Sequence, residues 1–180
     1  NDRFYRIPFE LDIEPRDSNY NILDVRAAFY PRGEKITADI KVDRPQSRAT
    51  VNINSADVNL GRFADLFSRA ADLMLSGEMA LHGKAQVLWQ PLRIASVNAS
   101  LTLEHAKIRV GEIQFQNAMA AGGKEVPFRI DLTGKSDGEW QFTGSRISMT
   151  APMPVNLAGI DGTIKRNAAA LESSGNFSVV

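Results

Sequence analysis

The 180-residue sequence has no cysteine, no net charge and few aromatic residues. Without cysteine, disulfide bonds and thiolate metal sites are excluded. Lys plus Arg number 21, the same as Asp plus Glu. Binding to nucleic acid needs clustered cations that neutralise phosphates, so we expect no nucleic-acid partner. The sequence also contains no apolar run of about 18 residues, the length that a membrane-spanning helix requires.

Motifs of familiar enzyme chemistry are also missing. The sequence has no G-x-S-x-G nucleophile motif and no Walker phosphate-binding motif. Asp131, Asp137 and Glu139 are close enough in sequence to suggest paired carboxylates for sugar hydrolysis. They flank an expected turn, however, where acidic side chains are usually solvated. We predict that the protein is not an enzyme.

The two histidines are the best remaining candidates for metal ligands. His82 falls on the polar side of an expected strand, and His105 lies where the strand pattern changes register. A metal site would also need a carboxylate such as Glu78 or Glu104. Histidines in such positions are more often surface residues than ligands, so we predict no metal and no cofactor.

An apolar content of 43% and a charged content of 23% are typical of a globular chain. Its longest patterned stretch, residues 76–115, alternates apolar and polar residues, which predicts strands with one apolar and one polar side. The register slips by one residue before Ala106 and again before Ile113. The candidate functional residues are the apolar ones of this stretch: Met79, Leu81, Val87, Val97, Leu101, Leu103, Ile108, Val110, Ile113 and Phe115.

Similar alternation recurs at 9–13, 23–29, 36–42 and 49–53, and from 128 to the end of the chain. Clusters of Pro, Gly, Asp and Ser separate the segments, as turns do. Asp161-Gly162 predicts a further hairpin. We expect ten to twelve antiparallel strands in a single β-rich domain covering 1–180. We also expect that this domain is a segment of a longer protein.

One stretch, near residues 60–74, has helical periodicity instead. Apolar residues at Phe63, Leu66, Phe67, Ala70 and Met74 form one stripe, which predicts an amphipathic helix. Because so short a helix is marginal alone in water, Phe63, Leu66 and Phe67 should dock it on the sheet or across an open end. Insertion into a membrane interface is the alternative, which the weakly charged polar side of the helix makes a poorer fit.

The runs ADVNLGRFADLF at 56–67 and LSGEMALHGKA at 75–85 resemble AsmA-like envelope proteins, which include the TamB and YdbH groups. The recurring pattern of that family is a short helix beside strands that read l-x-G-x-x-x-l-x-G. Here Leu75, Gly77, Leu81 and Gly83 occupy those positions. The segment LTLEHAKIRVGEI at 101–113 is also similar to YdbH-type sequence.

The resemblance implies a long U-shaped antiparallel sheet whose apolar inner face conducts phospholipid acyl chains across the periplasm of a Gram-negative envelope. It implies a role in outer-membrane homeostasis, tethering to a membrane through other parts of the protein, and partners among envelope proteins or further segments of the same chain. The alternation by itself is equally compatible with a closed β-sandwich. Such a sandwich would be a structural or interaction module, or would bind carbohydrate through Trp89 and Trp140.

Overall fold

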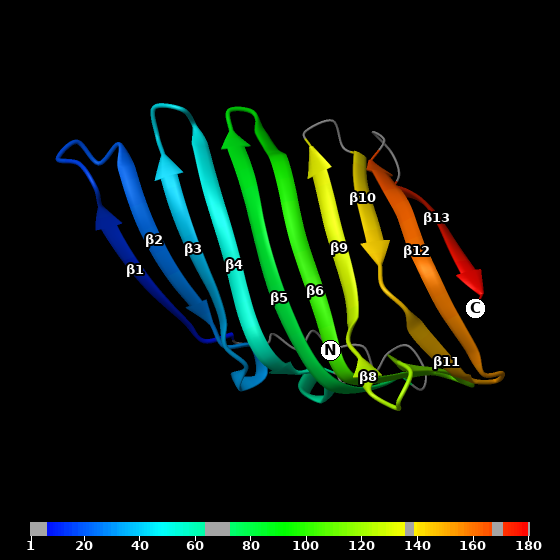
Figure 1. Ribbon diagram of the computed structural model, residues 1–180. Helices are drawn as coiled ribbons and strands as arrows, with labels where there is room; N and C mark the ends of the chain where they lie inside the picture. Colours follow the sequence, from blue (N-terminus) through cyan, green and yellow to red (C-terminus); the bar gives the residue numbers. More distant parts are fainter. Residues whose placement is uncertain (1–6, 64–72, 136–138, 167–170, 180) are drawn as a thin grey trace, which may run out of the picture.

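The computed structural model describes residues 7–63, 73–135, 139–166 and 171–179. Over these residues the chain forms one 13-stranded antiparallel sheet (Figure 1). Two 3-10 helices accompany it, η1 (Pro31–Gly33) and η2 (Leu60–Phe63). The strands are β1 (Phe9–Pro15), β2 (Ile22–Phe29), β3 (Ile36–Asp43), β4 (Arg48–Asn59), β5 (Leu73–Trp89), β6 (Leu92–Val110), β7 (Ile113–Met119), β8 (Glu125–Val126), β9 (Phe128–Lys135), β10 (Glu139–Gly144), β11 (Ile147–Ala151), β12 (Val155–Arg166) and β13 (Leu171–Val179).

The first six strands pair in chain order, each with the strand before and the strand after it. The strands expected at 9–13, 23–29, 36–42 and 49–53 are confirmed as β1 to β4. The stretch 76–115 forms the two longest strands, β5 with 17 residues and β6 with 19, together with the start of β7. This long hairpin is the centre of the sheet.

Beyond β6 the sheet closes on itself at one end. The Ser96–Leu103 part of β6 pairs with β9, whereas the Lys107–Val110 part pairs with β7. In the same way, β12 pairs with β11 near its start and with β10 further along. The strands β6, β9, β10, β12, β11 and β7 therefore form a ring, while β1 to β5 continue outside it. The sheet is partly ring-closed but is not a barrel.

The two-sheet sandwich left open by the sequence is not formed by the described residues. Their strands all belong to one connected sheet: β1 to β6 pair in chain order, and the later strands join through the pairings of β9 with β6, β11 with β12 and β7 with both β6 and β11. A sandwich would need strands that cross over to a second, facing sheet.

Bulges interrupt the pairing of β4, β5 and β6. Between Ser76 and Glu78 the register of β5 against β6 shifts, and Gly77 and His105 have positive φ angles of 112° and 52°. The pairing of β4 with β5 shifts between Ser55 and Val58. Bulges increase local twist and bend the strand. The slip in alternation before Ala106 therefore corresponds to a real bulge.

The helix predicted at 60–74 is wrong at both ends. Leu60–Phe63 is a 3-10 helix, and Leu73 already pairs with Val110 in the sheet. Cross-strand pairing thus overrides the local helical periodicity at the second end. Leu66, Phe67 and the side chain of Phe63 lie outside the described residues, so the predicted docking of the helix stays a prediction. The described residues contain no helix of seven or more residues.

The hairpin predicted at Asp161-Gly162 is also wrong, because both residues lie within β12. A Cβ atom at position 162 would lie 2.4 Å from Cζ of Phe142 and 2.3 Å from the carbonyl oxygen of Ser174. Glycine is present there because the Phe142 ring and the neighbouring backbone approach closely, not because the chain turns.

Candidate functional site: the apolar face of the sheet

The register places apolar side chains in continuous rows along one face of the sheet. Directly paired residues share a face. One row crosses ten strands and contains only apolar residues and glycine: Leu11, Ala27, Ala38, Ile53, Gly83, Ala99, Leu132, Phe142, Gly162 and Gly175. The next row crosses nine strands: Ile13, Val25, Ile40, Val51, Ala85, Val97, Gly134, Trp140 and Ile164. We call the surface that these rows form the apolar face.

The opposite face is polar over the same ten strands. The row between the two apolar rows contains Asp12, Arg26, Asp39, Asn52, Lys84, Asn98, Thr133, Gln141, Thr163 and Ser174. Such a difference between the faces is expected of a sheet with one solvated side. Here, however, the apolar face is also only partly covered. In β1, 66% of Phe9, 53% of Leu11 and 54% of Ile13 remain exposed.

The ten candidate residues from the sequence fall into three groups. Leu81, Val87 and Val97 are half-buried on the apolar face outside the core cluster. Val110 and Ile113 pair across the turn between β6 and β7, and 46% and 42% of their surfaces are exposed. The other five contribute to the packed core inside the ring: Met79, Leu101, Leu103, Ile108 and Phe115.

That core is the only extended cluster of buried apolar residues in the described part of the chain. Its buried members are Leu103, Ala106, Phe128 and Ile147, and they come from β6, β9 and β11. The ring therefore brings together strands that are far apart in sequence. The apolar face thus has a closed end, where the ring buries it, and an open part over β1 to β5 and the Val97 end of β6.

Sequence reasoning missed two aromatic–glycine contacts on this face. A Cβ atom at Gly134 would lie 2.4 Å from Cδ1 of Trp140, and Gly162 has the same relation to Phe142. Each ring therefore lies against the backbone of the neighbouring strand, as aromatic residues beside glycine do in sheets. No sequence pattern signals these contacts, because each glycine and its aromatic partner lie on different strands. One side of Trp140 is consequently covered, which makes it a poor platform for stacking a sugar.

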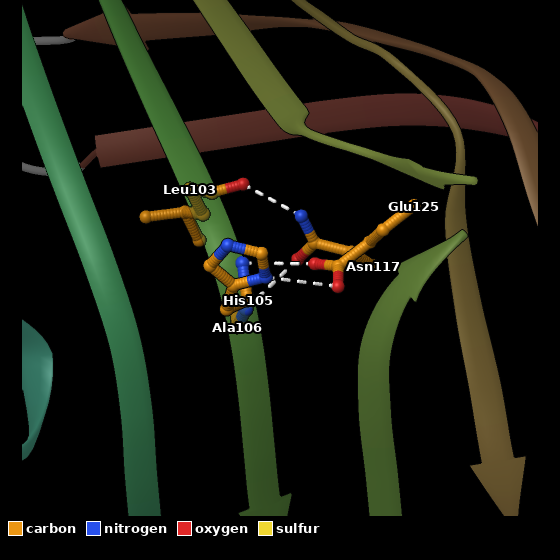
Figure 2. Close-up of polar contacts among 5 residues, drawn as sticks. All are labelled: Leu103, His105, Ala106, Asn117 and Glu125. Atoms are coloured by element: carbon orange, nitrogen blue, oxygen red, sulfur yellow. Dashed lines mark hydrogen bonds and ion pairs between the residues drawn. The ribbon is translucent and has the colours of Figure 1, made fainter. Parts of the chain in front are cut away.

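Polar side chains bind the backbone of β6 at the point where this strand changes its partner from β9 to β7 (Figure 2). Asn117 of β7 is 97% buried; its Nδ2 donates to the carbonyl oxygen of Leu103 (2.8 Å), and its Oδ1 accepts from the backbone N–H of Ala106 (3.1 Å). Glu125 of β8 accepts from the backbone N–H of His105 (2.8 Å) and lies 3.1 Å from Nδ1 of the His105 ring. These bonds satisfy backbone groups that the bulge removes from the ladder.

The hydrogen bond to Glu125 raises the pKa of His105 above its ordinary value, and the negative charge of Glu125 adds to the effect. Because the folded-state pKa is raised, the contribution of this pair to stability is fully present below the unfolded pKa of about 6.5. It is lost as the pH rises through the folded pKa.

We predict that Glu125→Gln lowers the pKa of His105 in an NMR titration of its ring protons. The amide keeps an oxygen for the His105 N–H but removes the charge. Glu112→Gln, in the exposed turn between β6 and β7, is the control and should leave the titration unchanged. An equal pKa in Glu125→Gln and wild type would contradict the pairing.

The described residues contain no group of three His, Cys, Asp or Glu side chains placed to hold a metal ion. Asp131 is bound by Arg129 and Glu139 by Lys165, so these acids pair with cations and not with one another. Asp137 lies outside the described residues. The remaining feature of functional interest is the apolar face.

Searches against protein-family models, characterised proteins and solved structures find no match. No helix in the described ranges is long and apolar enough to cross a membrane.

Proposed function

We propose that the open part of the apolar face binds lipid acyl chains, as the wall of a U-shaped groove. The observation that supports this proposal is the pair of apolar rows, which run without a charged residue across nine and ten strands. Monomeric proteins rarely leave a continuous apolar surface of this extent uncovered unless something binds there.

An acyl chain suits this surface because it needs no hydrogen bond. The backbone groups of the strand interiors are used within the sheet ladders, and the side chains in the two rows are aliphatic, aromatic or absent. A peptide lying on this face would leave its own backbone N–H and C=O groups unpaired, which is costly away from water. A methylene chain carries no such cost and gains about 0.8 kcal/mol for each buried CH₂.

The rows run across the strands, so an acyl chain would lie along the direction in which the strands succeed one another. Motion along such a row exchanges one apolar contact for a similar one. We therefore propose a conducting role, in phospholipid transport between the membranes of a cell envelope and in outer-membrane homeostasis, with a periplasmic location. The resemblance to AsmA-like proteins supports the same assignment. The proposal includes no catalytic step and no cofactor.

Site-specific photo-crosslinking tests this proposal with controls on the same strands. We expect a photoreactive amino acid at Leu81 or Val97 to form adducts with phospholipid in bacterial envelopes. The same group at the adjacent His82 or Asn98, which are more exposed but face the polar side, should form none. Mass spectrometry of the purified adducts identifies the lipid.

Folded protein that yields no lipid adduct at Leu81 or Val97 would contradict the proposal. Equal adducts at all four positions would contradict it too, because they would indicate general contact with membranes and not binding by one face.

A further inference from the structure

Three hairpin tips meet at one end of the strands. They connect β1 to β2, β3 to β4 and β5 to β6, and Figure 1 shows them in succession along the same edge. Nη1 of Arg44 donates to the carbonyl oxygen of Tyr20 (3.5 Å), which joins the first two tips. The N–H of Trp89 donates to the carbonyl oxygen of Ser47 (3.1 Å), which joins the second and third. The tips therefore form one connected edge, which we call the tip edge.

The tip edge carries apolar and aromatic side chains that the fold leaves in solvent. Leu92 has an exposure of 79%, the highest of the exposed large hydrophobic residues, and Tyr20 has 59%. Leu92 pairs with the half-buried Trp89, next to the exposed Pro91. None of these side chains contributes to the core cluster, so folding alone does not explain them.

The tip edge is continuous with the apolar face. Trp89 and Val87 alternate with Leu88 on β5, and their partners Leu92 and Ile94 lie opposite them on β6. Ile94 is 42% exposed. An apolar strip therefore runs from the tip of the β5–β6 hairpin onto the outermost row of the apolar face.

The charges of the tip edge leave two cations available. Of the acidic side chains there, Asp24 is bound by Arg16, Asp43 by Arg48 and by the N–H of Gln46, and Asp17 by the N–H of Ile22. Glu14, opposite Asp24, is exposed and its charge acts on Arg16. Arg44 and Arg93, by contrast, pair with no carboxylate among the described residues. Both side chains are exposed and flank the apolar residues.

We propose that the tip edge docks on the surface of a lipid bilayer that contains anionic lipids. Trp and Tyr favour the boundary between headgroups and acyl chains, because one end of each side chain is apolar and the other polar. Leu92 and Pro91 enter the acyl region beside them, and Arg44 and Arg93 contact phosphate oxygens. A peptide partner is less well matched, because the tips offer turns and not a free strand edge.

Docking at the tip edge would place the apolar strip against the bilayer, where an acyl chain could pass onto the apolar face. That consequence rests on the proposed function, whereas docking itself does not. The two are tested separately, docking by vesicle binding and acyl-chain binding by lipid adducts at Leu81 and Val97.

Flotation with vesicles tests the docking. We expect the protein to float with vesicles of phosphatidylcholine mixed with phosphatidylglycerol. Leu92→Asp should weaken this binding about tenfold or more, because the bilayer then no longer buries a leucine side chain. Met153→Asp is the matched control: Met153 is 61% exposed, in the turn between β11 and β12 at the other end of the strands, and its replacement should leave binding unchanged. Both variants should melt like wild type, since neither side chain is buried.

Fluorescence gives an independent measurement, because the chain has only two tryptophans. In Trp140→Phe, Trp89 is the sole tryptophan, and we expect the tryptophan emission to shift to shorter wavelength when vesicles are added. Arg93→Gln should weaken binding to the anionic vesicles about fivefold and leave binding to pure phosphatidylcholine unchanged.

Failure of the wild-type protein to float would overturn the proposal. So would equal binding by Leu92→Asp and wild type, equal loss in Leu92→Asp and Met153→Asp, or an unchanged Trp89 emission. If flotation occurs as expected but lipid adducts never form at Leu81 or Val97, the docking surface stands and the acyl-chain groove does not.

Discussion

Replacing Gly77 with alanine should destabilise the protein by about 3 kcal/mol or more. The residue has a φ of 112°, a conformation that side chains with a Cβ atom rarely adopt. A Cβ atom there would lie 2.7 Å from Cα of Ala106, 2.7 Å from the oxygen of Glu104 and 2.8 Å from the oxygen of His105. All three are backbone atoms of β6, so the clash cannot be relieved by rotating a side chain.

The control for this substitution is Gly111→Ala. Gly111 also has a positive φ, of 59°, but no atom lies within 4 Å of its Cβ position. Its replacement should therefore cost only the conformational strain, about 1–2 kcal/mol. Urea unfolding of the two variants separates strain from steric clash, and an equal loss of stability in both would contradict the close packing at the bulge.

The second large effect is expected from Phe128→Ala, which should destabilise the protein by about 3–5 kcal/mol. Phe128 is 8% exposed and packs in the core cluster with Leu103 and Ile147. These residues come from three different strands, β6, β9 and β11. The cavity left by the phenyl group of Phe128 therefore cannot be filled by movement of one strand. The loss should appear as a lower urea midpoint.

Phe9→Ala provides the comparison on the open part of the apolar face. Phe9 is 66% exposed, so its removal should change the free energy of unfolding by less than about 1 kcal/mol. Similar losses at Phe9 and Phe128 would mean that the open part is covered and stabilises the fold, which would also weaken the proposal that it binds acyl chains.

Together these expectations separate two parts of one surface. The closed end stabilises the sheet, because the ring of six strands buries apolar residues that come from several of its strands. The open part contributes less to stability and remains free to contact a ligand. A protein that binds acyl chains by area alone needs this division, since residues buried in the core are not available to the ligand.

The alternation of residues in the sequence was sufficient to predict most of the strands and their two faces. Side chains in a strand point alternately to opposite sides, so Val97 and Asn98 are assigned to different faces without knowledge of the partner strand. The slip before Ala106 was likewise readable as an irregularity. All ten candidate residues were assigned to the apolar register for the same reason, and the apolar positions of β1 to β4 showed the same signal.

Only the tertiary structure decided which strands pair, and hence which candidate residues are buried. Period-two alternation is local, and it does not indicate that β6 leaves β9 for β7 after Leu103, or that Asn117 and Glu125 satisfy the backbone there. For the same reason Met74, which belongs to the predicted helical stripe, joins a strand, and Asp161-Gly162, with the composition of a turn, lies inside β12. In each case a contact between residues distant in sequence is stronger than the local preference.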